Sequence, residues 1–142
     1  MLSILIRTPL RDTENPQKVK QAVLNVVSSV SFETEKSDGT CYLVVESKEL
    51  STLSPLHRKL REQRILETAR TILKKNASKD SVTFFLNKQA AYAGHIHFCE
   101  PERESPLGPI TVKISSENLD HLIDWLAPHT VKGKPMREVS LE

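Results

Sequence analysis

The sequence predicts an α+β fold in which helices pack on one face of a largely antiparallel sheet of about five or six strands. Two patterns support this fold class. Short segments alternate apolar and polar residues, as half-buried strands do, and longer segments space apolar residues three and four apart, as amphipathic helices do. We therefore expect the order strand, helix, two strands, long helix, three strands, helix.

The expected elements follow from these periods and from residues that begin and end helices. In chain order they are strands near 2–8, 30–35, 41–47, 81–86, 94–98 and 109–115, and helices near 16–28, 54–75 and between Ser116 and Pro128. Asn15 is a typical N-cap residue, and Pro16 suits the first helical position. Asp38-Gly39 predicts the turn between the second and third strands.

The longest predicted helix begins at Ser54-Pro55 and ends at Asn76. Its apolar residues share one arc that should face the core: Ile65, Leu66, Ala69, Ile72 and Leu73. Beside this arc runs a basic stripe, made of His57, Arg61, Arg64, Thr68 and Lys75. The stripe could meet a phosphate backbone, but its spacing alone favours an ordinary solvated helix face with glutamates nearby. Arg58 and Glu62 fall on the apolar arc itself, so the first turns either project past the sheet or bury an ion pair.

The chain has 142 residues, which fits one domain with a sizeable core. We expect residues 1–128 to form this single domain. Residues 129–142 are polar and contain Gly133 and Pro135, so we expect a C-terminal tail that docks or is loose.

Composition excludes several classes of protein. The formal net charge is only +2, which excludes a histone-like protein and requires any nucleic-acid contact to come from local clustering. No apolar run is long enough to span a bilayer, and the first residues lack the features of a signal peptide. Cys41 and Cys99 fit a reducing cytosol as two buried thiols, with a disulfide as the less favoured alternative. We therefore expect a cytoplasmic protein with no membrane contact.

Catalytic and metal-binding motifs find little support. His95 and His97 alternate on a predicted strand and could chelate a metal, but zinc requires three or four ligands and no spaced set completes the site. The sequence has no G-x-S-x-G elbow and no phosphate-binding glycine motif. We therefore expect no cofactor, no metal and no enzymatic activity.

The sheet face opposite the helices is the second candidate for binding, beside the basic stripe. Strand alternation directs five cationic or aromatic side chains to it: Arg7, Phe85, His95, His97 and Lys113. Aromatic surface mixed with cations is typical of sites that hold unpaired bases and phosphates. The alternative is that a second layer or a second subunit covers this face, with Phe85 as its anchor.

The polar cluster Asn87, Lys88 and Gln89 follows a predicted strand and precedes small residues. The amides could satisfy loop backbone groups, or the cluster could recognise RNA. We assign a structural role to Asn87 and Gln89, and a binding role to Lys88.

Five stretches together resemble one group of proteins. They are DTENPQKVKQAV, LREQRILETAR, FFLNKQAAYAG, SPLGPITVKI and DWLAP, in this order over nearly the whole chain. The chain resembles the archaeal uncharacterised protein family 0201, which is related to predicted RNA-binding proteins. The resemblance implies a fold similar to ribosomal protein L five, no established enzymatic activity, and RNA binding as an inference from that fold.

The family pattern falls on eight residues of this sequence: Arg61, Gln63, Arg64, Arg70, Asn87, Lys88, Gln89 and Tyr92. The chain departs from the family at Leu10-Arg11-Asp12, where a Pro-Thr-Glu-like start to the first helix would be expected.

These observations predict a non-catalytic RNA-binding protein of ribosome or RNA-processing type. The expected contacts are Arg58, Arg61, Arg64, Lys88, Phe85, His95, His97, Lys113 and Arg7. Arg61 and Arg64 are expected to serve binding and not folding. The alternative is a protein-interaction module, including a homodimer, with no nucleic-acid role.

Overall fold

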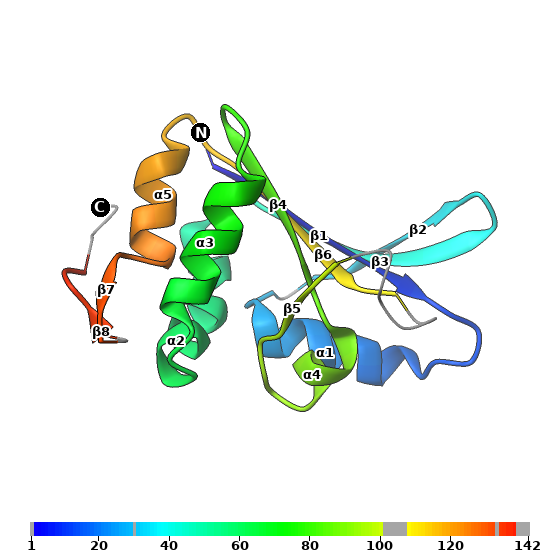
Figure 1. Ribbon diagram of the computed structural model, residues 1–142. Helices are drawn as coiled ribbons and strands as arrows, with labels where there is room; N and C mark the ends of the chain where they lie inside the picture. Colours follow the sequence, from blue (N-terminus) through cyan, green and yellow to red (C-terminus); the bar gives the residue numbers. More distant parts are fainter. Residues whose placement is uncertain (1, 30, 101–107, 133, 139–142) are drawn as a thin grey trace.

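A six-stranded antiparallel sheet forms the centre of the structure, a computed structural model that describes residues 2–29, 31–100, 108–132 and 134–138. Its strands are β1 (Ser3–Leu10), β2 (Glu33–Ser37), β3 (Thr40–Ser47), β4 (Ser81–Leu86), β5 (Phe98–Cys99) and β6 (Ile110–Ser115). They lie in the order β2-β3-β1-β6-β4-β5 (Figure 1). The predicted α+β class is confirmed.

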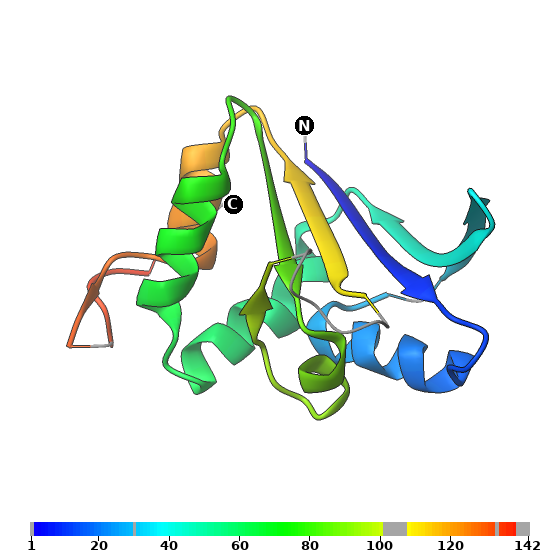
Figure 2. The same ribbon diagram turned by 45° about the vertical axis from the view of Figure 1, so that its right-hand side comes forward.

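The helices pack against one face of this sheet (Figures 1 and 2). They are α1 (Pro16–Val26), the short 3-10 helix η1 (Leu50–Leu53), α2 (Ser54–Glu62), α3 (Leu66–Asn76), α4 (Lys88–Tyr92) and α5 (Leu119–Leu126). Ile6, Phe84 and Val112 point toward the helices from three adjacent strands, and each is at most 1% exposed. Full burial of one such side chain contributes about 1.5–3 kcal/mol, so this layer contact stabilises the fold.

The first helix and the first hairpin form as their residues predict. The side chain of Asn15 accepts a hydrogen bond from the Gln17 amide at 2.9 Å, which caps α1. Asp38 and Gly39 have φ of 50° and 80°, the left-handed pair that turns two antiparallel strands with the correct twist.

The prediction of one long helix over 54–75 is wrong, because α2 ends at Glu62 and a separate helix, α3, begins at Leu66. Arg64 adopts a left-handed conformation with φ of 58°. Its amide donates to the Arg61 carbonyl at 3.1 Å, and the Ile65 amide donates to the Leu60 carbonyl at 3.1 Å. This pair of bonds is a Schellman motif, which ends α2 and redirects the chain. The predicted basic stripe is therefore divided between two helices.

The predicted strand over 94–98 is much shorter, since only Phe98 and Cys99 pair with β4. The backbone before β5 bonds to other partners. The His95 amide donates to the Ala90 carbonyl at 2.8 Å, and the Asn87 amide donates to the His97 carbonyl at 2.8 Å. His95 and His97 thus lie on a loop between α4 and β5.

The described part of the predicted tail forms a small hairpin beside α5 (Figure 1). Its strands are β7 (Thr130–Val131) and β8 (Lys134–Pro135), and the Met136 amide closes the hairpin by donating to the His129 carbonyl at 2.8 Å. Within the described residues, no helix is long and apolar enough to cross a bilayer.

Candidate nucleic-acid interface

The break between α2 and α3 brings two segments of candidate binding residues together. The Gln63 side chain accepts from the Ile96 amide at 2.6 Å and donates to the Ile96 carbonyl at 3.0 Å. Lys59 Nζ donates to the Gly94 carbonyl at 2.8 Å, a second tie between the same segments. Because Arg64 follows Gln63 and the two histidines flank Ile96, all three candidates lie at this corner.

We call this region the corner surface and define it by Arg58, Lys59, Arg64, His95 and His97. Four of these side chains are exposed, and Lys59 is half-buried. Arg58 Nε lies 3.2 Å from Glu62 Oε1, and both side chains are more than 60% exposed. An ion pair this exposed contributes little and is easily exchanged for a phosphate contact. The corner surface therefore carries accessible positive charge.

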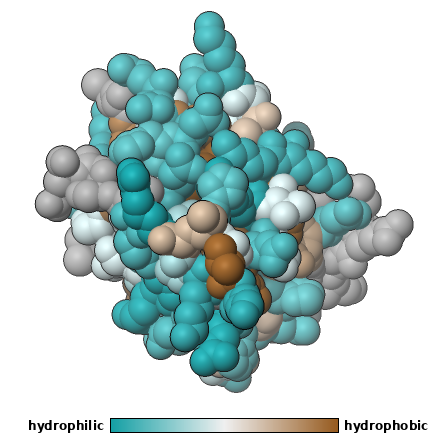
Figure 3. Space-filling view, turned by 60° about the vertical axis from the view of Figure 1, so that its left-hand side comes forward, coloured by the Kyte–Doolittle hydropathy of each residue, from teal (hydrophilic) through white to brown (hydrophobic). Residues whose placement is uncertain are grey.

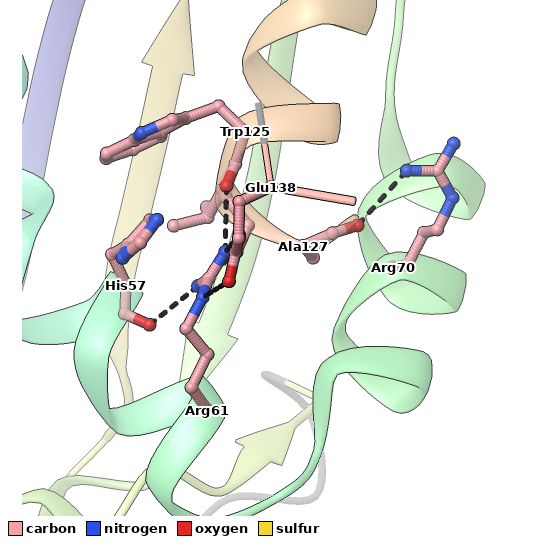
Figure 4. Close-up of polar contacts among 7 residues, drawn as sticks. His57, Arg61, Arg70, Trp125, Ala127 and Glu138 are labelled. Carbon is pink, nitrogen blue, oxygen red and sulfur yellow. Dashed lines mark hydrogen bonds and ion pairs between the residues drawn. The ribbon is translucent and has the colours of Figure 1, made fainter. Parts of the chain in front are cut away.

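Arg61, one turn before Arg64, has a structural role (Figure 4). Its guanidinium donates to the carbonyls of Trp125 and Leu126 at 3.1 and 3.2 Å, which lie at the end of α5. It also pairs with Glu138 at 2.7 Å and 2.9 Å, and its side chain is only 19% exposed. The expectation that Arg61 serves binding and not folding is inconsistent with these contacts.

Arg70 makes a similar contact from α3 (Figure 4). Its Nη1 donates to the Ala127 carbonyl at 3.1 Å and lies 2.8 Å from Asp124 Oδ1. A cation at the C-terminus of a helix can donate hydrogen bonds to the last carbonyls of that helix and interacts favourably with the negative end of its dipole. Arg61 and Arg70 therefore hold α5 and the hairpin against α2 and α3.

His57 lies beside the Arg61 contacts. Its ring stacks on Trp125 with 4.4 Å between ring centroids. Burial lowers the pKa of His57 below its ordinary value of 6.5, and the positive charge of Arg61 lowers it further, against an opposing effect of Glu138. The hydrogen bond from Arg61 also holds the pKa of Glu138 below its ordinary value of 4.5.

We expect acid to destabilise the protein through His57. Because its pKa is lowered in the folded state, the unfolded chain binds the proton first as pH falls below about 6.5. Stability is thus lost through that range and levels off below the folded pKa. The variant His57→Phe keeps an aromatic ring on Trp125 and cannot titrate, so its melting temperature should fall less between about pH 7 and pH 5. An equal fall in melting temperature with pH for both proteins would contradict this assignment.

Lys88 is buried instead of facing solvent. Its Nζ donates to the Pro9 carbonyl at 2.7 Å and lies 3.1 Å from Glu14 Oε2, with side chains only 5% and 8% exposed. Burial lowers the pKa of Lys88, and Glu14 partly restores it. Asn87 caps α4 by accepting from the Ala90 amide at 2.8 Å. The proposed binding role of Lys88 therefore conflicts with its burial, while Asn87 has the structural role predicted.

The open sheet face is less basic than its predicted residues imply. Arg7 lies 3.2 Å from Glu35 and stacks over the Tyr42 ring at 3.7 Å. Lys113 is exposed and Phe85 is half-buried. Strand register directs three glutamates to this face, against the two cations: Glu33, Glu35 and Glu46. A phosphate backbone is not favoured there.

The face formed by α3, α5 and the hairpin is largely hydrophilic (Figure 3). A groove of about 400 Å³ on it mixes both signs of charge, with Arg70, Lys74 and Arg137 beside Asp120 and Asp124. This mixture gives the groove no clear preference for an anion.

The described residues contain no group of three or more His, Cys, Asp or Glu side chains that could hold a metal ion. Cys41 and Cys99 are half-buried, and neither is in a disulfide.

The chain is similar to known proteins over nearly its whole length. A family model described as RNA binding matches residues 3–116. A UPF0201 protein of Sulfurisphaera tokodaii is 48% identical over 97% of this chain and 95% of its own length. A UPF0201 protein of Metallosphaera sedula is 44% identical over 96% of this chain and 94% of its own length.

A solved structure shares the fold over nearly the whole chain. The crystal structure of a UPF0201 protein from Methanococcus jannaschii superposes with a TM-score of 0.82 at 30% identity. The match covers 95% of this chain and 99% of that one.

Proposed function

We propose that this chain is a non-catalytic RNA-binding protein. It belongs to the archaeal UPF0201 family and matches a family model described as RNA binding. The family resemblance predicted from five sequence stretches is confirmed by these matches. We further propose that it acts on RNA of ribosomal or RNA-processing type, in the cytoplasm.

One observation carries the proposed binding surface. The Gln63 clamp on Ile96 joins the segment that carries the exposed Arg64 to the segment that carries two exposed histidines, more than 30 positions away. A guanidinium fork fits two phosphate oxygens, and imidazole rings can stack on unpaired bases or donate to phosphate. The corner surface therefore combines charge and aromatic contacts, which the open sheet face offers with less positive charge.

The binding surface can be tested with a substitution that is compatible with the backbone conformation at Arg64. Arg64→Gly removes one cation at a left-handed position, where glycine is the preferred residue, so folding should be preserved. We expect affinity for RNA to fall several-fold. The slope of log affinity against log salt should decrease by about 0.7, the loss of one phosphate contact with a single strand.

The chain offers a matched control at Lys132, which is exposed and also left-handed, with φ of 53°. Lys132→Gly removes the same charge from the β7–β8 turn and should leave affinity and salt slope close to wild type. Equal losses in both variants would show that only net charge matters, and the corner surface would be wrong. Absence of RNA binding by the wild-type protein at low salt would overturn the function itself.

A protein-interaction role remains the second candidate, and the acidic balance of the open sheet face favours it over RNA there. Phe85 and Leu5 are half-buried on this face and could anchor a second subunit. Light scattering over a range of concentrations decides this case, because a constant monomer mass excludes the homodimer.

A further inference from the structure

A pocket of about 360 Å³ lies between α1 and α4, apart from the corner surface. We call it the α1–α4 pocket. Its lining combines residues from two distant stretches, among them Glu14, Lys18, Val19, Lys88, Gln89 and Tyr92. Its size suits one small planar ligand with a polar group attached, and not a helix or a strand.

The floor of the α1–α4 pocket is polar in composition but electrically neutral. The buried Lys88 ammonium pairs with the Glu14 carboxylate at 3.1 Å, and the Arg11 amide donates to Glu14 at 2.9 Å. Val19 and Ala22, both nearly fully buried, add an apolar wall from α1. A neutral floor beside an apolar wall suits an uncharged ring better than a phosphate.

The rim of the pocket carries three side chains that can meet solvent. Tyr92 is 48% exposed, so a large part of this aromatic side chain is accessible to a ligand. Gln89 and Lys18 are exposed beside it, on α4 and α1. An aromatic ring, an amide and a cation are the groups that stack on a base, bond its edge and contact its phosphate.

We propose that the α1–α4 pocket receives one unpaired nucleotide of the bound RNA, with its base stacked on Tyr92. Gln89, for which a structural role was expected, is exposed on the rim, and we assign its amide to the base edge and Lys18 to the phosphate. This inference rests on the proposed function and adds its substrate class: RNA with an unpaired nucleotide, because a base inside a duplex cannot leave its stack without cost.

The pocket is joined to the corner surface by a short, well-tied segment. Asn25 Nδ2 donates to the carbonyls of Ala91 and Tyr92 at 2.9 and 3.2 Å, which fixes the end of α4 against α1 (Figure 1). The His95 amide then donates back to the Ala90 carbonyl at 2.8 Å. Hydrogen bonds thus hold the backbone on both sides of the segment from Tyr92 to His95, and we expect one strand of RNA to contact both side chains.

The experiment compares a single-stranded RNA with a duplex of the same sequence, using three variants at fixed salt. Tyr92→Ala should weaken binding of the single strand by about tenfold, the loss of one base stack, and leave duplex binding unchanged. Tyr92→Phe keeps the ring and should retain wild-type affinity. Leu24→Ala removes another exposed hydrophobic side chain of this region, 36% exposed and outside the pocket, and should have no effect.

The outcomes separate this inference from the proposed function. Wild-type binding with no effect of Tyr92→Ala on the single strand would overturn the pocket and leave RNA binding intact. An equal loss for single strand and duplex would also overturn it, because the contact would not distinguish an unpaired base. Failure of the wild-type protein to bind either RNA would overturn the proposed function, and the pocket with it. Thermal unfolding of each variant confirms that the compared proteins are folded.

Discussion

Replacing Arg61 with methionine is expected to lower the free energy of unfolding by about 2–3 kcal/mol. The methionine keeps apolar packing but donates no hydrogen bond. The Trp125 and Leu126 carbonyls at the end of α5 then lose their charged donor, and the hairpin loses its tie through Glu138. Glu138 is 52% exposed, so most of the loss should come from the carbonyls and not from the ion pair. Urea unfolding, followed by circular dichroism, measures the change.

Arg58 provides the matched control in the same helix. Arg58→Met removes an identical side chain whose partner Glu62 is exposed, and we expect a change below about 0.5 kcal/mol. Equal effects of the two variants would contradict the structural role of Arg61. The comparison also matters for RNA binding, since a charge reversal at Arg61 would lower affinity by damaging the fold. Arg64→Gly does not have this ambiguity.

The spacing of apolar residues along the chain predicted most helices and strands, because the formation of each element depends mainly on residues close together in sequence. The first strand, α1 with its Asn15 cap, and the Asp38-Gly39 turn are determined by local geometry. The break after α2 also left a local signal. Leu56 and Leu60 lie on a different arc from Leu66 and Leu73 if one helix is drawn through all four, and a helix that changes its buried arc is two helices.

The candidate site was harder to predict because the availability of a cation depends on distant partners. Arg61 meets a glutamate 77 positions away, and Lys88 meets one 74 positions away. Charge pattern identifies which residues are cations but not which cations are neutralised by the fold. Gln63 shows the same limit, since its clamp on a backbone segment 33 positions away has no periodic signature. The sequence thus identifies the cations but not which of them the fold leaves accessible.

Replacing Lys88 with methionine is expected to lower the free energy of unfolding more than any other single substitution considered. The Glu14 carboxylate, only 8% exposed, would keep its charge without a partner, and removing one member of a buried ion pair costs about 3–5 kcal/mol. Lys74→Met is the control, because the Lys74–Asp120 pair at 3.3 Å has side chains 42% and 85% exposed. Its effect should lie within about 0.5 kcal/mol.

A second change separates the loss of the pair from the loss of packing. In the double variant Glu14→Gln with Lys88→Met, the glutamine oxygen can still accept from the Arg11 amide, and no charge is left buried. We expect it to be more stable than Lys88→Met alone, because the uncompensated charge accounts for most of the cost. If the double variant were as unstable as the single one, the cost would come from the lost Pro9 contact and the cavity instead. This pair also forms the floor of the α1–α4 pocket. The stability of the double variant therefore shows whether that floor must carry an ion pair or can be filled by two uncharged side chains.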